Sequence, residues 1–297
     1  MYDCVIIGGG IAGLQASIQL GRYMYKVVII DRQGGRSVLA KRYMNVLGWP
    51  KGVSGKELLA KGVEQANAVG VNFLEGEVKD VRKEEDGFTL LLDRGESIRC
   101  KRLLLSTGVD DQFPSIEGLG ETLGTSFYVC PDCDGYEIQN KKTVVVGSGN
   151  SGAAISCILT HWNETIVYIN HEPEKNISAK WRGNCQEKNI PIIEGPVLRI
   201  VSSNENQLSH IELIDGQTIP AEKGFVAFEG KRPVNELAKQ LGVALDEHGS
   251  GLVDGRTQQT NVENLWAAGD VVLHSQLVTR AMGDGSQAAI WIHKSLK

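Results

Sequence analysis

The sequence lacks the features of several common classes of protein. No apolar run approaches the roughly 18 residues that a membrane-spanning helix needs, so no membrane span is expected. There is no basic excess, because 36 acidic residues outnumber 31 Lys and Arg and leave a net charge of −5, which disfavours nucleic acid as a partner. Asp3 and the glycines from Gly8 leave no room for a signal peptide, which indicates the reducing cytoplasm.

The cysteines lack the pattern of a zinc site. Only Cys130 and Cys133 have the Cys-x-x-Cys spacing, and the other four are scattered: Cys4, Cys100, Cys157 and Cys185. No second Cys-x-x-Cys and no His-x-x-x-His completes a tetrahedron, so we expect no metal. In a reducing compartment this spacing is more typical of a disulfide that opens and closes than of a buried structural pair, which remains the alternative.

Glycine is abundant, and part of it forms a nucleotide-binding motif near the N-terminus. A short apolar strand at residues 4–7 runs into G-x-G-x-x-G, with its glycines at Gly8, Gly10 and Gly13 and with Ala12 between the last two. A helical pattern and a second apolar strand follow, and that strand ends at Asp31, at the distance expected of a carboxylate that binds a ribose. Bare glycines let a pyrophosphate reach the free N–H groups of the helix. A glycine-rich structural turn is the alternative.

Two later strand ends favour FAD over NAD as the bound nucleotide. One apolar strand ends at Thr107-Gly108, and another, near the C-terminus, ends at Gly269-Asp270. A second acid at a strand end suits a contact to the ribityl chain or a phosphate of the flavin. The wide separation of these strands implies that the FAD-binding domain is interrupted by an insert and resumes near the C-terminus.

The insert carries a second nucleotide-binding pattern. A strand at residues 143–146 enters the G-x-G-x-x-G of residues 147–152, and a helix and a strand at 165–169 follow. We therefore predict an α/β protein with two Rossmann-like, three-layer ββα nucleotide-binding domains, the second inserted into the first. The expected bounds are 1–115 and 246–297 for the FAD-binding domain and 116–245 for the insert.

These motifs, in this order, resemble the low-molecular-weight thioredoxin reductases over essentially the whole chain. The resemblance implies FAD as cofactor, thioredoxin as electron acceptor, a homodimer and a rotation between the domains. It also implies that Cys133 is the sulfur on the flavin side, that Cys130 attacks thioredoxin and that Asp134 serves as acid–base. A non-catalytic flavoprotein that senses redox state is an alternative, as is a dithiol oxidase, whose relatives tend to carry His where this chain has Asp134.

The same resemblance implies further cofactor contacts. Asn45 is expected to make a polar contact with the flavin, the backbone at Val78 to meet the adenine, and Gln276 to lie near the flavin. Trp291 and His293 have either a place beside the flavin or, as we favour, a role in packing. His274 has no obvious partner in the sequence and is interpreted as structural.

The insert lacks the residues that hold NADPH in the thioredoxin reductases. Counting without a gap from Gly147, the three phosphate-binding arginines of that family fall on His171, Glu172 and Asn176, and the position of a ribose-binding acid falls on Asn170. A glutamate repels a phosphate, and each lost charge-assisted bond costs roughly 1.5–3 kcal/mol. NADPH is therefore disfavoured. NADH is a milder possibility if Glu172 takes the place of the missing acid.

A thioredoxin reductase without NADPH contacts resembles the ferredoxin-dependent flavin thioredoxin reductases. In that family ferredoxin gives single electrons to FAD, which reduces the disulfide. Ferredoxins are generally acidic, and the stretch from Arg32 to Lys61 holds seven basic residues against one acidic residue. We predict ferredoxin docking on this stretch. A solvated basic face that contacts the FAD phosphates is the alternative, and an NAD(P)H-dependent reductase is the rival function.

Overall fold

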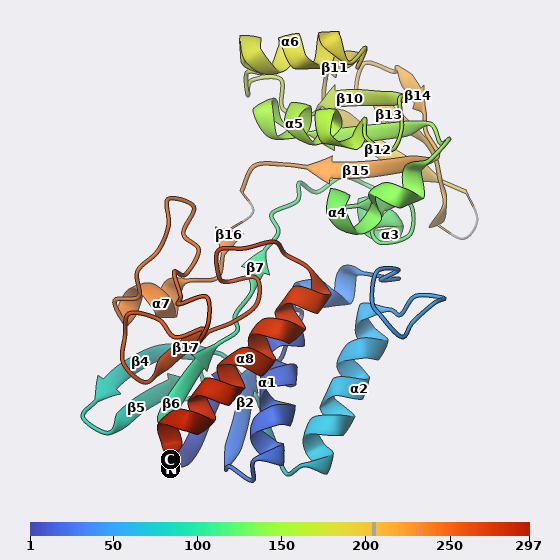
Figure 1. Cartoon of the computed structure of the whole chain (residues 1–297). Coiled ribbons are helices and arrows are strands. Elements are labelled where there is room, and N and C mark those ends of the chain that lie inside the picture. The colour runs from blue at the N-terminus through green and yellow to red at the C-terminus, as the bar shows by residue number, and fades with distance from the viewer. Residues whose placement is uncertain (204–205, 231) are drawn as a thin grey trace. The chain divides into compact units, whose positions relative to one another are not determined.

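The computed structural model describes residues 1–203, 206–230 and 232–297 and divides into two compact units (Figure 1). Unit 1 contains Met1–Val38, Ser54–Asp110 and Arg232–Lys297, and unit 2 contains Leu39–Val53 and Asp111–Lys231. The fold is mixed α/β with a Rossmann-like sheet in each unit, which confirms the predicted fold class.

Unit 1 is built on a seven-stranded sheet in the order β3-β2-β1-β6-β5-β4, with β17 paired to β6. The pairs among β1, β2, β3, β6 and β17 are parallel, whereas β4, β5 and β6 form an antiparallel meander. The strand bounds are β1 (Tyr2–Ile7), β2 (Val27–Asp31), β3 (Asn72–Glu75), β4 (Val78–Glu84), β5 (Gly87–Leu92), β6 (Ser97–Leu105) and β17 (Leu265–Ala267).

Successive apolar residues of the parallel strands point to opposite faces of the sheet in unit 1, so both faces are buried. In β1, Cys4 and Ile6 belong to a core packed under helices, while Val5 and Ile7 belong to the core on the other face of the sheet. The helix α8 lies along α1 on the first face (Figure 1). The remaining bounds are α1 (Ile11–Arg22), the 3₁₀ turn η1 (Arg36–Leu39), α2 (Gly55–Ala68), α7 (Glu236–Gln240) and α8 (Val278–Leu296).

The compact units differ from the predicted domain bounds in three places. Unit 2 begins at Asp111 rather than at residue 116. The chain returns to unit 1 at Arg232 rather than at residue 246, because β16 (Arg232–Pro233) pairs with β7 (Val109–Asp110) and because Ala238 and Val243 lie in the core of unit 1. The segment Leu39–Val53 joins unit 2, where a Cβ on Gly124 would lie 2.4 Å from the carbonyl oxygen of Leu39.

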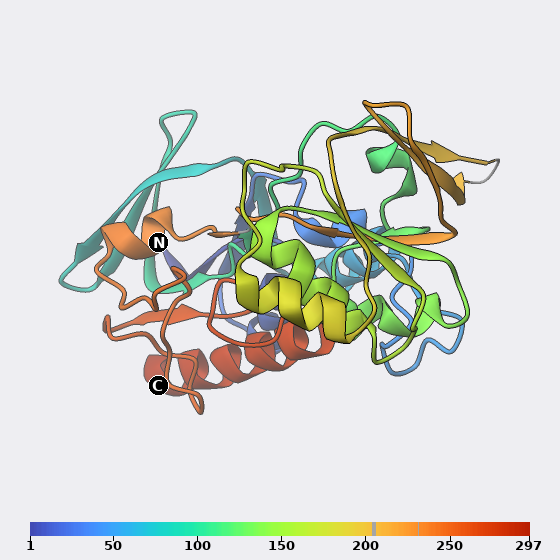
Figure 2. The same cartoon turned by 90° about the horizontal axis from the view of Figure 1, so that it is seen from above.

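Unit 2 has three layers. A parallel sheet in the order β11-β10-β9-β15-β8 lies between helices and a small antiparallel sheet in the order β12-β13-β14 (Figure 2). Along β9, Val144 and Val146 face the small sheet and Val145 faces the helices. The strands are β8 (Phe127–Tyr128), β9 (Thr143–Gly147), β10 (Ile166–Asn170), β11 (Ile192–Glu194), β12 (Val197–Ser202), β13 (Leu208–Leu213), β14 (Thr218–Pro220) and β15 (Lys223–Ala227). The helices are α3 (Leu119–Thr122), α4 (Pro131–Asp134), α5 (Gly149–Leu159) and α6 (Ala179–Glu187), with the 3₁₀ turn η2 (Gly135–Ile138).

Within the described ranges, none of the helices is both long enough and apolar enough to cross a membrane.

Two glycines two residues apart in α8 give a matched test of how closely this helix approaches α1. A Cβ at Gly285 would lie 2.2 Å from the carbonyl oxygen of Ala12, whereas a Cβ at Gly283 would meet nothing within 4 Å. We expect Gly283→Ala to stabilise the helix by about 0.5–1 kcal/mol and Gly285→Ala to destabilise the protein by about 1–3 kcal/mol. Thermal unfolding of the two variants measures the difference, and equal melting temperatures would contradict this packing.

Candidate active site

The N-terminal glycine loop is shaped by close backbone contacts at two of its glycines and is open at the third. Gly8 has φ +104°, and a Cβ there would lie 2.3 Å from the carbonyl oxygen of Ser106. A Cβ at Gly13 would lie 2.0 Å from the carbonyl oxygen of Gly8, yet a Cβ at Gly10 would meet nothing within 4 Å. No side chain caps the N-terminus of α1, which begins after Gly10. The free N–H groups of this turn are therefore open to an anion.

The end of β2 brings a carboxylate to the same loop. Asp31 accepts a hydrogen bond from the backbone N–H of Gly9 at 3.0 Å and another from that of Gln33 at 2.8 Å. The half-buried carboxylate thus lies at the carboxyl end of a parallel strand beside the helix N-terminus. This is the position from which an acid accepts ribose hydroxyls in dinucleotide-binding folds.

The ends of β6 and β17 contribute the other predicted cofactor residues of unit 1. The hydroxyl of Thr107 donates to the carbonyl of Val234 at 2.6 Å, and Gly108 has φ +70°. Gly269 has φ +79°, and a Cβ there would lie 2.8 Å from the Cβ of Ala12. Because β17 runs parallel to β6, both strands end at the edge of the sheet where the glycine loop lies.

Arg36 joins two of these residues, and sequence reasoning missed it. Its Nη1 donates to Oε1 of Gln276 at 2.8 Å and lies 3.5 Å from the carboxylate of Asp270. The sequence showed only a basic residue five positions after Asp31, which was counted as part of a charged stretch. A cation bound to both the acid and the amide that are expected to contact the flavin fixes the direction in which both side chains point.

Two residues predicted to contact the cofactor, Val78 and Asn45, differ from the others in burial or in the unit to which they belong. Val78 begins β4 with its side chain in the core of unit 1, so only its backbone is available to a ligand. Asn45 is exposed and belongs to unit 2, unlike the other predicted cofactor residues.

The histidines near the C-terminus have identifiable partners. His274, interpreted as structural without an obvious partner in the sequence, does have a partner: its Nε2 contacts the buried carboxylate of Asp284, which also accepts from Nε of Arg280 at 2.9 Å. His293 stacks on Tyr23 at 4.1 Å and bonds the hydroxyl of Tyr25 at 2.9 Å. Tyr23 follows the C-terminus of α1, so His293 lies at the opposite end of that helix from the glycine loop.

Trp291, in the last turns of α8, lies beside two cations, one from α8 and one from the loop before β17. The ammonium of Lys294 lies 4.0 Å from the centre of its ring, and the guanidinium of Arg256 lies 5.5 Å from it. Cations over an aromatic face stabilise by roughly 0.5–1 kcal/mol at exposed sites. These contacts support packing as the role of Trp291, as the ring contacts of His293 do for that residue.

The contact between His274 and Asp284 predicts a pH-dependent contribution to stability. Burial alone would lower the pKa of His274, but the hydrogen bond and the charge of Asp284 raise it above the ordinary value of 6.5. The stabilisation is therefore complete below about pH 6.5 and is lost as the pH rises through the higher pKa of the folded state. We expect His274→Gln to cost about 1.5–3 kcal/mol near pH 6 and less near pH 9. Melting temperatures of the wild type and the variant across this pH range check the prediction. A difference in melting temperature that does not change with pH would contradict it.

Cys130 and Cys133 form a disulfide whose geometry is set by a short helix. Their Cα atoms are 5.3 Å apart, and both residues are half-buried. Cys130 is the N-cap of α4, with Pro131 at the first helical position, and its Sγ accepts the N–H of Cys133 at 3.2 Å. A Cβ at Gly135 would lie 2.7 Å from the ring of Trp162, so the turn after the pair is packed closely on that side chain. An N–H directed at Sγ favours a thiolate at Cys130 once the bond opens.

Lys223 and Tyr128, from two neighbouring strands, interact electrostatically with the acidic residues that follow the disulfide. Lys223 in β15 donates through Nζ to the hydroxyl of Tyr128 in β8 at 2.8 Å. Burial lowers the pKa of Lys223, against the charges of Glu137 and Asp134, and burial raises the pKa of Tyr128 with help from the same two acids. Asp134 therefore acts on a cation and a phenol as well as standing next to Cys133.

The second glycine loop shares the spacing of the first but not its open centre. A Cβ at Gly149 would lie 3.5 Å from Cβ of Lys175 and from the carbonyl oxygen of Asn176, where the corresponding Gly10 has free space. The N–H of Gly149 donates to Oδ1 of Asn170 at 3.0 Å, and Asn150 accepts the N–H of Ser178 at 2.9 Å. The loop between β10 and α6 is thus fastened over the glycine turn.

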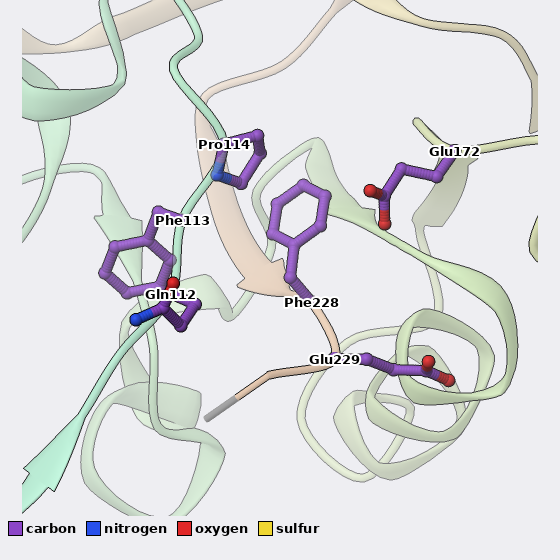
Figure 3. A pocket seen from close by; sticks show the side chains of 6 residues that line it. All are labelled: Gln112, Phe113, Pro114, Glu172, Phe228 and Glu229. Atoms are coloured by element: carbon purple, nitrogen blue, oxygen red, sulfur yellow. The ribbon is translucent and has the colours of Figure 1, made fainter. Parts of the chain in front are cut away.

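An acidic pocket lies beside this loop in unit 2. It has a volume of about 210 Å³ and is lined by Glu172, Phe228, Glu229, Gln112, Phe113 and Pro114. The carboxylate of Glu172 is directed toward the ring of Phe228, and that of Glu229 points away from it (Figure 3). Glu172 pairs with Lys175 at 2.9 Å, which lowers its pKa. His171 accepts the N–H of Val197 through Nδ1 at 2.9 Å, and burial lowers its pKa. Neither residue presents a positive charge to a phosphate.

Comparison with known proteins places the chain among relatives of the same architecture. A family model described as pyridine nucleotide-disulphide oxidoreductase matches residues 2–285. The chain belongs to this family. The thioredoxin reductase of Helicobacter pylori is 27% identical over 98% of this chain and 97% of that protein. The crystal structure of HlmI has a TM-score of 0.89 at 29% identity and covers 99% of this chain and 92% of its own. The thioredoxin reductase from Giardia duodenalis has a TM-score of 0.86 at 25% identity, covering 99% and 98%.

This pyridine nucleotide-disulphide oxidoreductase family uses FAD, and unit 1 fits that cofactor. The uncapped first turn of α1 and the free space at Gly10 suit a pyrophosphate, and Asp31 suits a ribose. In the described part of the chain, no group of three or more His, Cys, Asp or Glu side chains is arranged to hold a metal ion.

Proposed function

We propose that the protein is a thioredoxin reductase that delivers electrons through FAD to the Cys130–Cys133 disulfide and then to thioredoxin. The observation that carries the proposal is the half-buried disulfide with Cys130 at the N-cap of α4, in a chain whose N-terminal glycine loop is open. The relatives named thioredoxin reductase support it, because they match along nearly the whole chain. Bound FAD would supply the electron pair that opens the disulfide.

The cysteines and Asp134 have separate tasks in the proposed cycle. Two electrons and two protons convert the disulfide into two thiols. The thiolate of Cys130, favoured by the N–H of Cys133, attacks the disulfide of oxidised thioredoxin and forms a mixed disulfide. Cys133 then attacks Cys130 in that mixed disulfide, which restores the bond and releases reduced thioredoxin. Asp134 moves the proton of the departing or attacking sulfur. Homodimer formation and a cytoplasmic location belong to the same proposal.

For the electron donor we propose ferredoxin rather than a pyridine nucleotide. The cover over Gly149 and the carboxylate of Glu172 disfavour a dinucleotide pyrophosphate and a 2′-phosphate in unit 2. The alternative donor is a pyridine nucleotide, NADPH or NADH, which the name of the family includes. Of the basic stretch Arg32–Lys61, Arg32 pairs with Glu77 and Lys61 with Glu57, while Lys41 and Lys51 have no carboxylate partner among the described residues.

The direct test is anaerobic reduction of the bound flavin by three donors in parallel. We expect reduced ferredoxin to bleach the flavin, with subsequent turnover of thioredoxin, and we expect NADPH and NADH to bleach it only slowly and without saturation. Stopped-flow absorbance follows the reaction. Rapid, saturable bleaching by micromolar NADPH would overturn the choice of donor and leave the reductase itself in place.

Gly10→Ala tests the proposed position of FAD. Nothing lies within 4 Å of the added methyl group and the backbone of Gly10 has φ −72°, so the protein without cofactor should keep its melting temperature. A pyrophosphate against Gly10 would be displaced, and we expect FAD affinity to fall about tenfold or more. Titration of the stripped protein with FAD measures it. Gly255→Ala, also in open space in unit 1, is the control, and equal FAD affinity in both variants would place the cofactor elsewhere.

Cys130→Ser should separate the two half-reactions. The variant keeps its FAD and its reduction by the donor, but thioredoxin turnover should fall by about 10³-fold or more because the attacking sulfur is gone. Cys157→Ser is the matched control, since this buried cysteine of α5 lies outside the proposed cycle. Thioredoxin turnover that survives in Cys130→Ser would disprove the assigned role.

A further inference from the structure

The segment Leu39–Val53 forms a closed, anchored loop. Tyr43 and Val53 exchange two backbone hydrogen bonds of 2.7 and 3.1 Å, and Nε of Arg42 donates to the carbonyl of Lys51 at 2.8 Å. The side chains of Val46 and Val53 are buried, and the segment belongs to unit 2. Its conformation is therefore defined by internal bonds at its base.

The tip of this loop holds apolar side chains in water. Leu47 is 97% exposed and Met44 is 43% exposed. The turn at the tip requires the positive φ of Gly48, +93°, but makes no use of the leucine side chain. An ordered loop that exposes a complete leucine gains nothing from it in folding, since hydrophobic stabilisation comes only from area removed from water. Single exposed apolar side chains are ordinary on protein surfaces, so Leu47 indicates a partner only together with the charges that flank it.

Cations flank the apolar tip. The segment contains Lys41, Arg42 and Lys51 and no acidic residue, although the whole chain has a net charge of −5. All three are exposed, and none forms an ion pair with a carboxylate among the residues the structure describes. A patch of +3 around a leucine complements a surface that carries carboxylates around an apolar spot.

We infer that the loop Leu39–Val53 is the docking surface for an acidic protein that carries electrons, with Leu47 seated on an apolar spot of that partner. The identity of the partner as the electron donor rests on the proposed function. Arg36, which bonds Gln276 and Asp270, precedes the loop by three residues, so the loop is continuous in sequence with the proposed cofactor contacts. An isolated leucine with three cations favours a protein over a lipid surface, because one exposed aliphatic side chain gives little insertion into a bilayer.

The two kinds of side chain make different contributions to binding. Burying Leu47 would tighten the complex by roughly 10- to 100-fold at any salt concentration. The lysines would raise the association rate at low salt, and this effect would disappear as salt screens the charges.

The experiment measures binding of oxidised bacterial ferredoxin, as the acidic probe, to the FAD-loaded protein and its variants at low and high salt. We expect Leu47→Ser to raise the Kd about 10- to 100-fold at both, and Lys41→Ser with Lys51→Ser to raise it only at low salt. Ile214→Ser, at a side chain 65% exposed in unit 2, and Lys83→Ser, at an exposed lysine of unit 1, are the matched controls and should bind like the wild type. Equal binding by all variants, or no binding by the wild type, overturns the inference.

Two further readouts separate this inference from the proposed function. Reduction of the flavin by dithionite should be unchanged in every variant, because a small reductant needs no docking surface. Reduction of the wild-type flavin by ferredoxin tests the donor independently of the loop. If ferredoxin reduces the wild type and Leu47→Ser at equal rates, the docking surface is overturned and the donor stands. Leu47-dependent sedimentation with phosphatidylserine vesicles, without ferredoxin binding, would also overturn it in favour of a membrane.

Discussion

Backbone packed directly against backbone at the first turn of α1 is the contact on which unit 1 depends. Gly13 approaches the carbonyl of Gly8, Gly285 approaches that of Ala12, and Gly269 approaches the Cβ of Ala12. Each position excludes a Cβ because another segment occupies that space. The ends of β1 and β17 and the first half of α8 consequently meet at one point. The polar groups that follow these ends, among them Asp270 and Gln276, are brought together as a result.

The two glycine loops share their close contacts and differ in the space around the middle glycine. In both, the first and third glycines are required by close contacts: Gly8 with Ser106 and Gly147 with Ala227, or Gly13 with Gly8 and Gly152 with Tyr168. The middle glycine differs, since free space surrounds Gly10 whereas the loop after β10 covers Gly149. A G-x-G-x-x-G pattern therefore indicates how a strand meets a helix. Only the space around its second glycine indicates whether a phosphate has room.

The disulfide, by contrast, depends on local sequence for its geometry and on distant strands for the charges around it. The N-cap position of Cys130, Pro131 and the N–H of Cys133 arise within four residues of sequence. The charge of Lys223 and the hydroxyl of Tyr128 reach the neighbourhood of Asp134 from β15 and β8. Local sequence thus decides that the sulfurs can bond, and the sheet of unit 2 decides the electrostatic setting in which they react.

The sequence by itself determined whatever depends on neighbours along the chain. The apolar run at residues 4–7 gave the first strand, glycine spacing gave the strand-to-helix turns, and the spacing of Cys130 and Cys133 gave the disulfide. Only the tertiary structure decided which side chains meet across elements. It gave His274 a buried carboxylate, joined Arg36 to Gln276 across 240 residues, and returned the chain to unit 1 at Arg232. Such pairs depend on how helices and strands pack, and no local pattern encodes the direction from which a distant residue arrives.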